Sequence, residues 1–136
     1  MVNIIISSDS KYEVDQAIIQ STVLSVLNRH KVGGKVEVGI SIIGDRRMHE
    51  LNRKYRGVDS TTDILNFAMQ DPTPINLTHL PKVGFVKPKD KWLRLGDIVV
   101  SFPQILEDAA MDGISVDEEI RMLVEHGVAH LLGHHH

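Results

Sequence analysis

The chain has 136 residues, of which 42% are hydrophobic and 24% charged, and its formal net charge at pH 7 is -3. These values are typical of one globular domain and exclude disordered, collagen-like and coiled-coil proteins. The chain has no cysteine, which excludes disulfides, thiolate metal sites and cysteine nucleophiles. Because no apolar run reaches the ~20 residues of a membrane span, we expect a cytoplasmic protein without a membrane partner.

Strands and helices alternate along the first half of the chain. The apolar spacing predicts a strand over residues 2–7, a helix over 11–29, a strand over 36–43, a helix over 46–55 and a strand over 62–67. Gly44 and Asp45 suit the N-cap of the second helix. Residues 70–95 contain four of the five prolines and many lysines, so we expect a long irregular loop there.

The second half is predicted to contain one more strand and two helices. Residues 96–101 form the strand, and Pro103 fits the first turn of the helix that follows. Ser115 and Glu118 form a capping box that opens the last helix, which we expect to end near Gly133. The order predicts a single α+β (mixed α/β) domain over residues 1–136, with roughly four strands in a mixed sheet and four or five helices.

Histidines are concentrated at the end of the chain, where five of the eight lie in the last eleven residues. His126 and His130 are four residues apart on a predicted helix, so their imidazoles share one face and can reach one metal ion. Gly133 lets the chain turn back, so that His136 can supply a third nitrogen. This spacing is that of the zinc motif H-E-x-x-H-x-x-G-x-x-H, and three imidazoles leave a fourth zinc position for water. We therefore expect a zinc site at the end of the last helix.

Two features argue for other interpretations of the histidines. The protease motif has a glutamate general base after the first histidine, but here that residue is Gly127. Residues 134–136 also look like the remnant of an affinity tag, which would leave only His126 and His130 as native histidines of the motif.

Three segments resemble one known family. Residues 126–136 have the sequence H-G-V-A-H-L-L-G-H-H-H, which resembles the H-G-x-L-H-L-x-G-Y-D-H signature of the YbeY rRNA maturation factors, zinc endoribonucleases specific for single strands. Residues 51–67 are similar to the family's L-N-x-x-Y-R-x-x-D-x-P-T-D-V-L-S-F, and residues 95–101 to its L-G-D-I-x-I-S. The departures from these patterns are Thr61, Asn66, Ala129, His134 and His135.

The resemblance implies a function and a set of site residues. It implies one zinc ion bound by His126, His130 and His136, with Arg56 as a functional arginine beside the metal. Imidazole sites also bind nickel well, so nickel can replace zinc in purified samples. Since the family continues past the third histidine, we expect this chain to be cut short there or to end in a tag.

The implied partner is RNA, in the form of ribosomal RNA, the ribosome or its small subunit. Arg56 offers a planar, two-pronged donor for a phosphate. Arg53 and Lys54 belong to a basic stretch, residues 45–56, with five Lys or Arg against two acids, and Trp92 can stack on an unpaired base or cover the edge of the core. Asp97 either orients a ligand histidine from behind or caps a turn.

We therefore expect a metal-dependent endoribonuclease that acts on single-stranded RNA in ribosomal RNA processing and ribosome quality control. Its proposed catalytic residues are Arg56, His126 and His130. Two other functions remain open: a zinc hydrolase of peptides or small molecules, and a non-catalytic ribosome-associated binding module. The general base, the RNA sequence preference and the oligomeric state do not follow from the residues.

Overall fold

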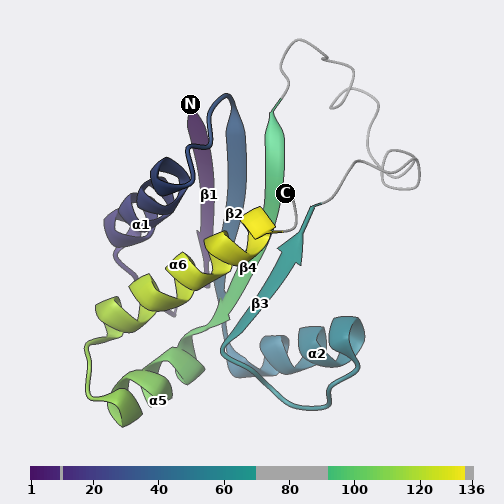
Figure 1. The fold of residues 1–136 in the computed structure, drawn as a ribbon. Helices are drawn as coiled ribbons and strands as arrows, with labels where there is room; N and C mark the ends of the chain where they lie inside the picture. Colours follow the sequence, from purple (N-terminus) through teal and green to yellow (C-terminus); the bar gives the residue numbers. More distant parts are fainter. Residues whose placement is uncertain (10, 70–91, 134–136) are drawn as a thin grey trace.

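The computed structural model describes residues 1–9, 11–69 and 92–133 (Figure 1). The described elements are four strands and four helices in the order strand, helix, strand, helix, strand, strand, helix, helix. They are β1 (Val2–Ser8), α1 (Gln16–Arg29), β2 (Val36–Ile43), α2 (Asp45–Arg56), β3 (Ile64–Ala68), β4 (Leu93–Ser101), α5 (Phe102–Asp112) and α6 (Val116–Gly133). The predicted order of elements and the single α+β domain are confirmed, with four helices.

The four strands form one mixed sheet in the order β1-β2-β4-β3. β1 pairs with β2 and β2 with β4 in parallel, whereas β3 runs antiparallel to β4. Among the described strands, β3 therefore has a neighbour on one side only.

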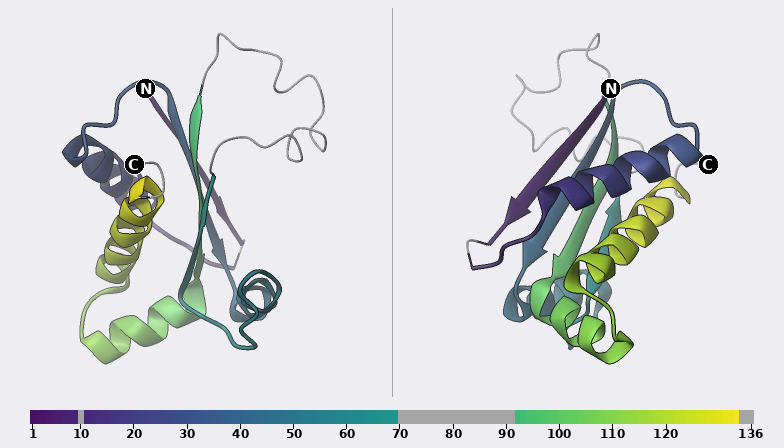
Figure 2. Two further views of the ribbon diagram at one scale, coloured as in Figure 1. Left: turned by 45° about the vertical axis from the view of Figure 1, so that its right-hand side comes forward. Right: turned by 90° about the vertical axis from the view of Figure 1, so that its left-hand side faces the viewer.

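The helices cover the two faces of the sheet unequally. Figure 2 shows α1 and α6 on one face and α2 on the other. Under α1 and α6 lies the main core, which includes Val23, Ile40, Ile98 and Val128. On the opposite face, α2 inserts Met48 into a smaller cluster with Ile43, Leu65 and Val99. The central strands are apolar on both faces for this reason.

α1 and α2 begin at other residues than predicted, because their N-caps are Asp15 and Gly44. α1 begins at Gln16 rather than Lys11, since the Asp15 carboxylate accepts a hydrogen bond from the Ala17 N–H at 3.0 Å. In α2 the N-cap is Gly44, whose backbone is extended, and Asp45 is already inside the helix.

Asp45 instead fastens the start of α2 to the end of β4. Its carboxylate accepts hydrogen bonds from the side chains of Ser101 at 2.6 Å, Gln104 at 3.1 Å and Thr61 at 3.1 Å. Burial raises the pKa of Asp45, but these three donors outweigh it and hold the pKa below its usual value. The carboxylate is therefore a structural tie between α2, β4 and α5.

The region around the predicted loop is partly described. Residues 70–91 lie outside the described residues, and β4 begins at Leu93, three residues before the predicted start, since the Leu93 N–H donates to the Lys35 carbonyl at 2.7 Å. Of the predicted capping box, one hydrogen bond is described: the Glu118 N–H donates to the Ser115 hydroxyl at 3.1 Å. The Glu118 carboxylate accepts from Arg121. Within the described part of the chain, no helix combines the length and apolarity needed to cross a bilayer.

Candidate functional site

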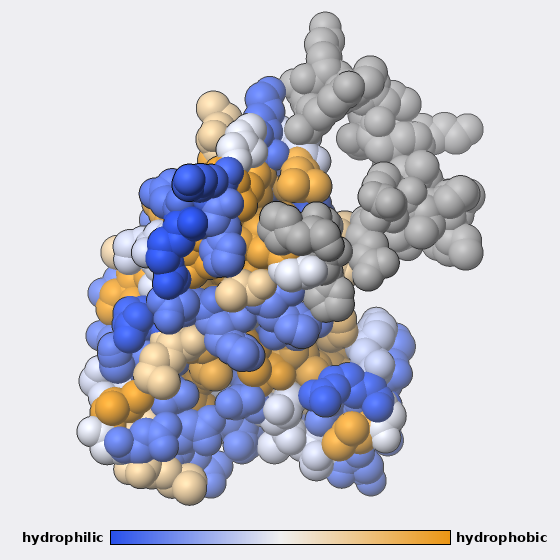
Figure 3. Space-filling view, viewed as in Figure 1, coloured by the Kyte–Doolittle hydropathy of each residue, from blue (hydrophilic) through white to orange (hydrophobic). Residues whose placement is uncertain are grey.

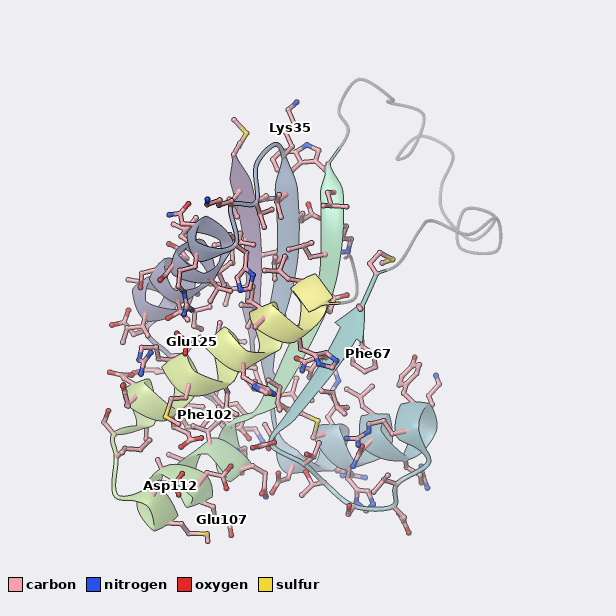
Figure 4. All side chains as sticks on the ribbon, viewed as in Figure 1. Lys35, Phe67, Phe102, Glu107, Asp112 and Glu125 are labelled. Carbon is pink, nitrogen blue, oxygen red and sulfur yellow. The ribbon has the colours of Figure 1, made fainter. Side chains whose placement is uncertain are left out.

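A cleft of about 510 Å³ opens beside β3. One wall comes from the end of α2 on one face of the sheet, and the other wall comes from α6 on the opposite face. The lining residues are Tyr55 and Arg56 from α2, Ile64, Leu65, Asn66 and Phe67 from β3, and His126 and His130 from α6. In Figure 4, Phe67 marks the β3 part of this cleft.

His126 and His130 occupy one face of α6, and both side chains are exposed at the cleft. The helix lies close to the sheet because the residue after His126 is glycine. A Cβ atom on Gly127 would lie 2.9 Å from the Asn66 Oδ1 atom and 3.0 Å from the Ile98 Cδ1 atom. Gly127 therefore lets α6 approach β3 and β4 closely enough to set His126 beside the β3 edge.

The donor set for a metal is incomplete within the described residues. Among them, no three His, Asp or Glu side chains come together in a way that could hold a metal ion. The described part supplies the pair His126 and His130, whose nitrogen donors and helical spacing suit zinc or nickel. His136, the predicted third ligand, lies outside the described residues with His134 and His135, so the three-histidine site stays a prediction.

Arg56 shares the cleft with the two histidines, although seventy residues separate it from His126. It is the last residue of α2, and Gly57 ends the helix in the left-handed conformation at φ 71°. The Arg56 side chain is exposed. Arg53 and Lys54 are also exposed on the last turn of α2, but they do not line the cleft.

Asp97 is not brought to the cleft. Along β4 successive side chains alternate between the faces, so Asp97 shares the α2 face with Val99, while Ile98 faces α6. The Asp97 carboxylate accepts a hydrogen bond from Arg94 at 2.9 Å. From this position it does not meet His126 or His130, and the described contacts do not support the predicted orienting role.

Trp92 also lies away from the cleft. It precedes β4, and the ammonium of Lys35 is 5.9 Å from its ring centroid. Figure 4 labels Lys35 at the start of β2, far along the sheet from Phe67. Trp92 is 36% exposed, so it remains an accessible aromatic residue, but one outside the site.

Two polar residues of the cleft were missed in the sequence. Tyr55 is 57% exposed, and its ring meets Phe67 edge-on, with the centroids 5.3 Å apart. The Asn66 Oδ1 atom is buried against α6 and has no hydrogen-bond partner in the described structure. The sequence contained a clue to each of these residues. Tyr55 lies between Lys54 and Arg56 in the segment 51–67 that resembles the family, and Asn66 replaces the serine that is usual in that segment.

Charge is distributed unevenly around the site. The last turn of α2 carries Arg53, Lys54 and Arg56, and Figure 3 shows a mostly polar outer surface on this helix. The region near the start of α6 is acidic instead, because four carboxyl groups approach one another there. They belong to Asp63, Asp108, Asp112 and Glu119, hereafter the acidic cluster. The basic side of the molecule therefore borders the cleft, which favours an anionic ligand there.

Comparison with known proteins identifies the family of the chain. A family profile described as Endoribonuclease YbeY matches residues 4–136. An Endoribonuclease YbeY from Roseiflexus sp. is 42% identical over 123 residues, covering 90% of this chain and 71% of the relative. Another from Dehalococcoides mccartyi is 36% identical over 135 residues, covering 99% and 77%.

The fold has a solved counterpart. A protein from Thermotoga maritima, whose structure was determined in solution, superposes with a TM-score of 0.58 at 21% identity, over 94% of this chain and 71% of that one. This likeness concerns the fold alone. The sequence matches carry the assignment further: the chain belongs to the YbeY endoribonuclease family.

Proposed function

We propose that this protein is a metal-dependent endoribonuclease that cuts single-stranded RNA in the cytoplasm during ribosomal RNA processing. The observation that carries the proposal is the shared cleft, in which Arg56 from α2 and His126 and His130 from α6 face one opening. Relatives at 36–42% identity are named endoribonucleases, which supports the same chemistry here.

The metal in this proposal is zinc, bound by His126, His130 and His136. When bound, zinc would lower the pKa of a coordinated water and polarise a phosphoryl oxygen. The two described imidazoles fit that role because they are adjacent on one helical face and open to the cleft.

The chain's own residues bind and orient the RNA. Arg56 presents a guanidinium fork that matches two oxygens of one phosphate and can stabilise charge that develops there. Ile64 and Leu65 contribute apolar atoms to the lining of the cleft. Ribosomal RNA, the ribosome or its small subunit would supply the unpaired strand.

The lining of the cleft also bears on the alternatives. Its described side chains include no carboxylate, and Gly127 stands where a zinc peptidase has its glutamate base. This composition disfavours the peptidase. The attacking group would be either the ribose 2′-hydroxyl or a water molecule, and the product ends distinguish the two: a 2′,3′-cyclic phosphate indicates attack by the 2′-hydroxyl.

The test is cleavage of a single-stranded RNA by the wild type, Arg56→Ala and Arg53→Ala. We expect Arg56→Ala to lower kcat/KM by about 10²-fold, the usual cost of removing a donor to developing charge. Arg53→Ala is the matched control, because it removes the same charge from the same helical turn outside the cleft. An equal loss of kcat/KM in both variants would mean that Arg56 contributes only its positive charge and not a specific contact. If the wild type does not cleave the RNA, the proposed activity is wrong.

A further inference from the structure

Tyr55 is the most exposed aromatic side chain of the described residues, at 57%. Aromatic rings are usually buried, because each removes a large apolar area from water. Tyr55 instead lines the cleft beside Arg56, its neighbour in sequence. An accessible ring at the mouth of a cleft, next to a cation, has the composition of a ligand-binding surface rather than of a core.

The ring is held in place before any ligand arrives. Phe67 packs against it with an interplanar angle of 75° and is itself anchored on the small cluster under α2. On another side, the Lys54 ammonium lies 5.2 Å from the Tyr55 ring centroid. Because the Phe67 contact limits the motion of the ring, Tyr55 loses little conformational entropy when it binds a flat partner.

We propose that Tyr55 stacks on an unpaired base of the RNA, while Arg56 holds a phosphate of the same strand. The proposal rests on the endoribonuclease function above and adds a positioning residue to it. The base takes the place of the Lys54 ammonium over the ring, and the flexible lysine side chain swings out to a phosphate. Trp92, the aromatic residue first expected to stack, lies outside the cleft.

This contact gives a physical reason for a preference for single strands. In a duplex both faces of each base are already covered by stacked neighbours, so Tyr55 has no free face to meet. An unpaired base offers that face, and stacking on an aromatic side chain depends little on base identity. The same residue therefore favours unpaired RNA without imposing a sequence.

The experiment measures the Kd for a short single-stranded 2′-O-methyl RNA, which keeps bases and phosphates but lacks the 2′-hydroxyl nucleophile. Tyr55→Ala is expected to weaken binding by roughly 5- to 150-fold, the equivalent of one lost base stack. Tyr55→Phe and Tyr55→Trp are expected to retain most of the affinity. Binding of a duplex of the same sequence should change little in any of these variants.

A set of oligonucleotides, each with one abasic position, separates stacking from a structural effect. Wild type should lose affinity strongly at one position of the set, and Tyr55→Ala should show no further loss there. Trp92→Ala, which removes an exposed aromatic residue outside the cleft, should keep the wild-type pattern. The wild-type pattern itself needs no variant, so it remains informative if Tyr55→Ala fails to fold.

Two results would overturn the inference: an equal loss of affinity at the abasic position in wild type and Tyr55→Ala, or an equal loss for duplex and single strand. Failure of the proposed function looks different. In that case wild type binds with the Tyr55-dependent pattern but releases no products from unmodified RNA. If wild type binds no RNA, both proposals are wrong.

Discussion

At the scale of single residues, Gly127 controls how closely α6 approaches the sheet. Its missing Cβ leaves room for the Asn66 Oδ1 atom and for the Ile98 and Ile64 side-chain ends, all within 3.3 Å of the place that a Cβ would occupy. Gly127 therefore differs from the glutamate of the protease motif in two ways: it has no carboxylate, and it leaves space for β3 and β4 side chains.

We expect Gly127→Ala to lower the free energy of unfolding. Overpacking costs about 1–3 kcal/mol, and the better helix propensity of alanine returns up to about 1 kcal/mol, so the net loss is on the order of 1 kcal/mol. Urea denaturation measures it. Because the clash pushes α6 outward from the β3 edge, His126 should also move, and RNA cleavage should fall.

Gly133→Ala is the control for this substitution, because it lies on the same helix with no atom within 4 Å of its Cβ position. It should leave stability unchanged or slightly raised. Adding Asn66→Ala to Gly127→Ala should recover part of the loss, since the shortened side chain vacates the contested space. A Gly127→Ala protein as stable as wild type would contradict this account of the helix position.

Some roles of the site residues can be predicted from the sequence, and others cannot. His126 and His130 could be predicted as a pair, because their separation on one helix defines their geometry. The steric role of Gly127 could not, since the atoms it accommodates come from β3 and β4. The face that Asp97 occupies could not be predicted for a related reason, because it depends on which side of the sheet each helix covers.

At the scale of elements, the acidic cluster joins the start of β3 to α5 and α6. Burial raises the pKa of Asp108, and a hydrogen bond and the charge of Asp63 raise it further. Burial also raises the pKa of Glu119, with added repulsion from Asp112 and Asp108. Glu119 is only 5% exposed, and its Oε1 atom has no hydrogen-bond partner in the described structure. Figure 4 labels Asp112 and Glu107 on α5.

A raised pKa makes the folded state bind protons more readily than the unfolded chain. The stability that these carboxyl groups contribute is therefore complete below the unfolded pKa near 4, and it is lost as the pH rises through the higher folded value. Asp108→Asn removes one charge from the cluster. We expect this variant to be more stable than wild type at pH 7, with a gain that shrinks as the pH falls toward 5.

Urea denaturation of both proteins at pH 5, 6, 7 and 8 measures that difference. Asp117→Asn is the control, because Asp117 is an exposed acid in the first turn of α6 outside the cluster. It should produce no gain that grows with pH. If Asp108→Asn is less stable than wild type at pH 7 and 8, the carboxyl groups do not repel one another as described.

The sequence predicted which helices and strands form more accurately than it predicted the residues at which they begin and end. Pro103 and Ser115 mark the starts of α5 and α6 because their effect is confined to one helical turn. The start of β4 at Leu93 was missed, since it depends on a hydrogen bond to Lys35 far away in the chain. Asp45 looked like a cap, but its partners Ser101 and Gln104 meet it only in the folded protein.

At the scale of the whole molecule, the proposed zinc site predicts coupling between metal and stability. A ligand that binds only the folded chain stabilises it by about 2.7 kcal/mol at a concentration of 100 Kd. We therefore expect added zinc to raise the Tm of the metal-free protein by several degrees, and His126→Ala to abolish most of that shift. His136→Ala should reduce the shift if residue 136 is a ligand.

His49→Ala is the control for the zinc experiment. His49 is an exposed histidine on α2 that bonds to Asp59 and does not line the cleft. Its zinc-induced shift should match that of wild type. The same shift in His126→Ala would mean that zinc binds elsewhere, for example to residues 134–136 alone.

The fold class and the family could be predicted from the whole sequence, because three separate segments resemble one family in the same order. The positions of these segments relative to one another in the fold could not be predicted from the resemblance. Arg56 and His126 line one cleft because α2 and α6 flank β3 on opposite faces of the sheet. That arrangement depends on the pairing of β3 with β4, which leaves no trace in the local pattern of either strand.

The position of β3 has a consequence for how the cleft can change. Asn66 contacts the α6 side and its neighbour Phe67 the α2 side, so two consecutive residues set the separation of the two walls. A slip of one residue in β3 would exchange the two side chains and reverse both contacts at once. Side-chain size at Asn66 therefore acts on the α6 wall and side-chain size at Phe67 on the α2 wall, so that one wall can shift without the other.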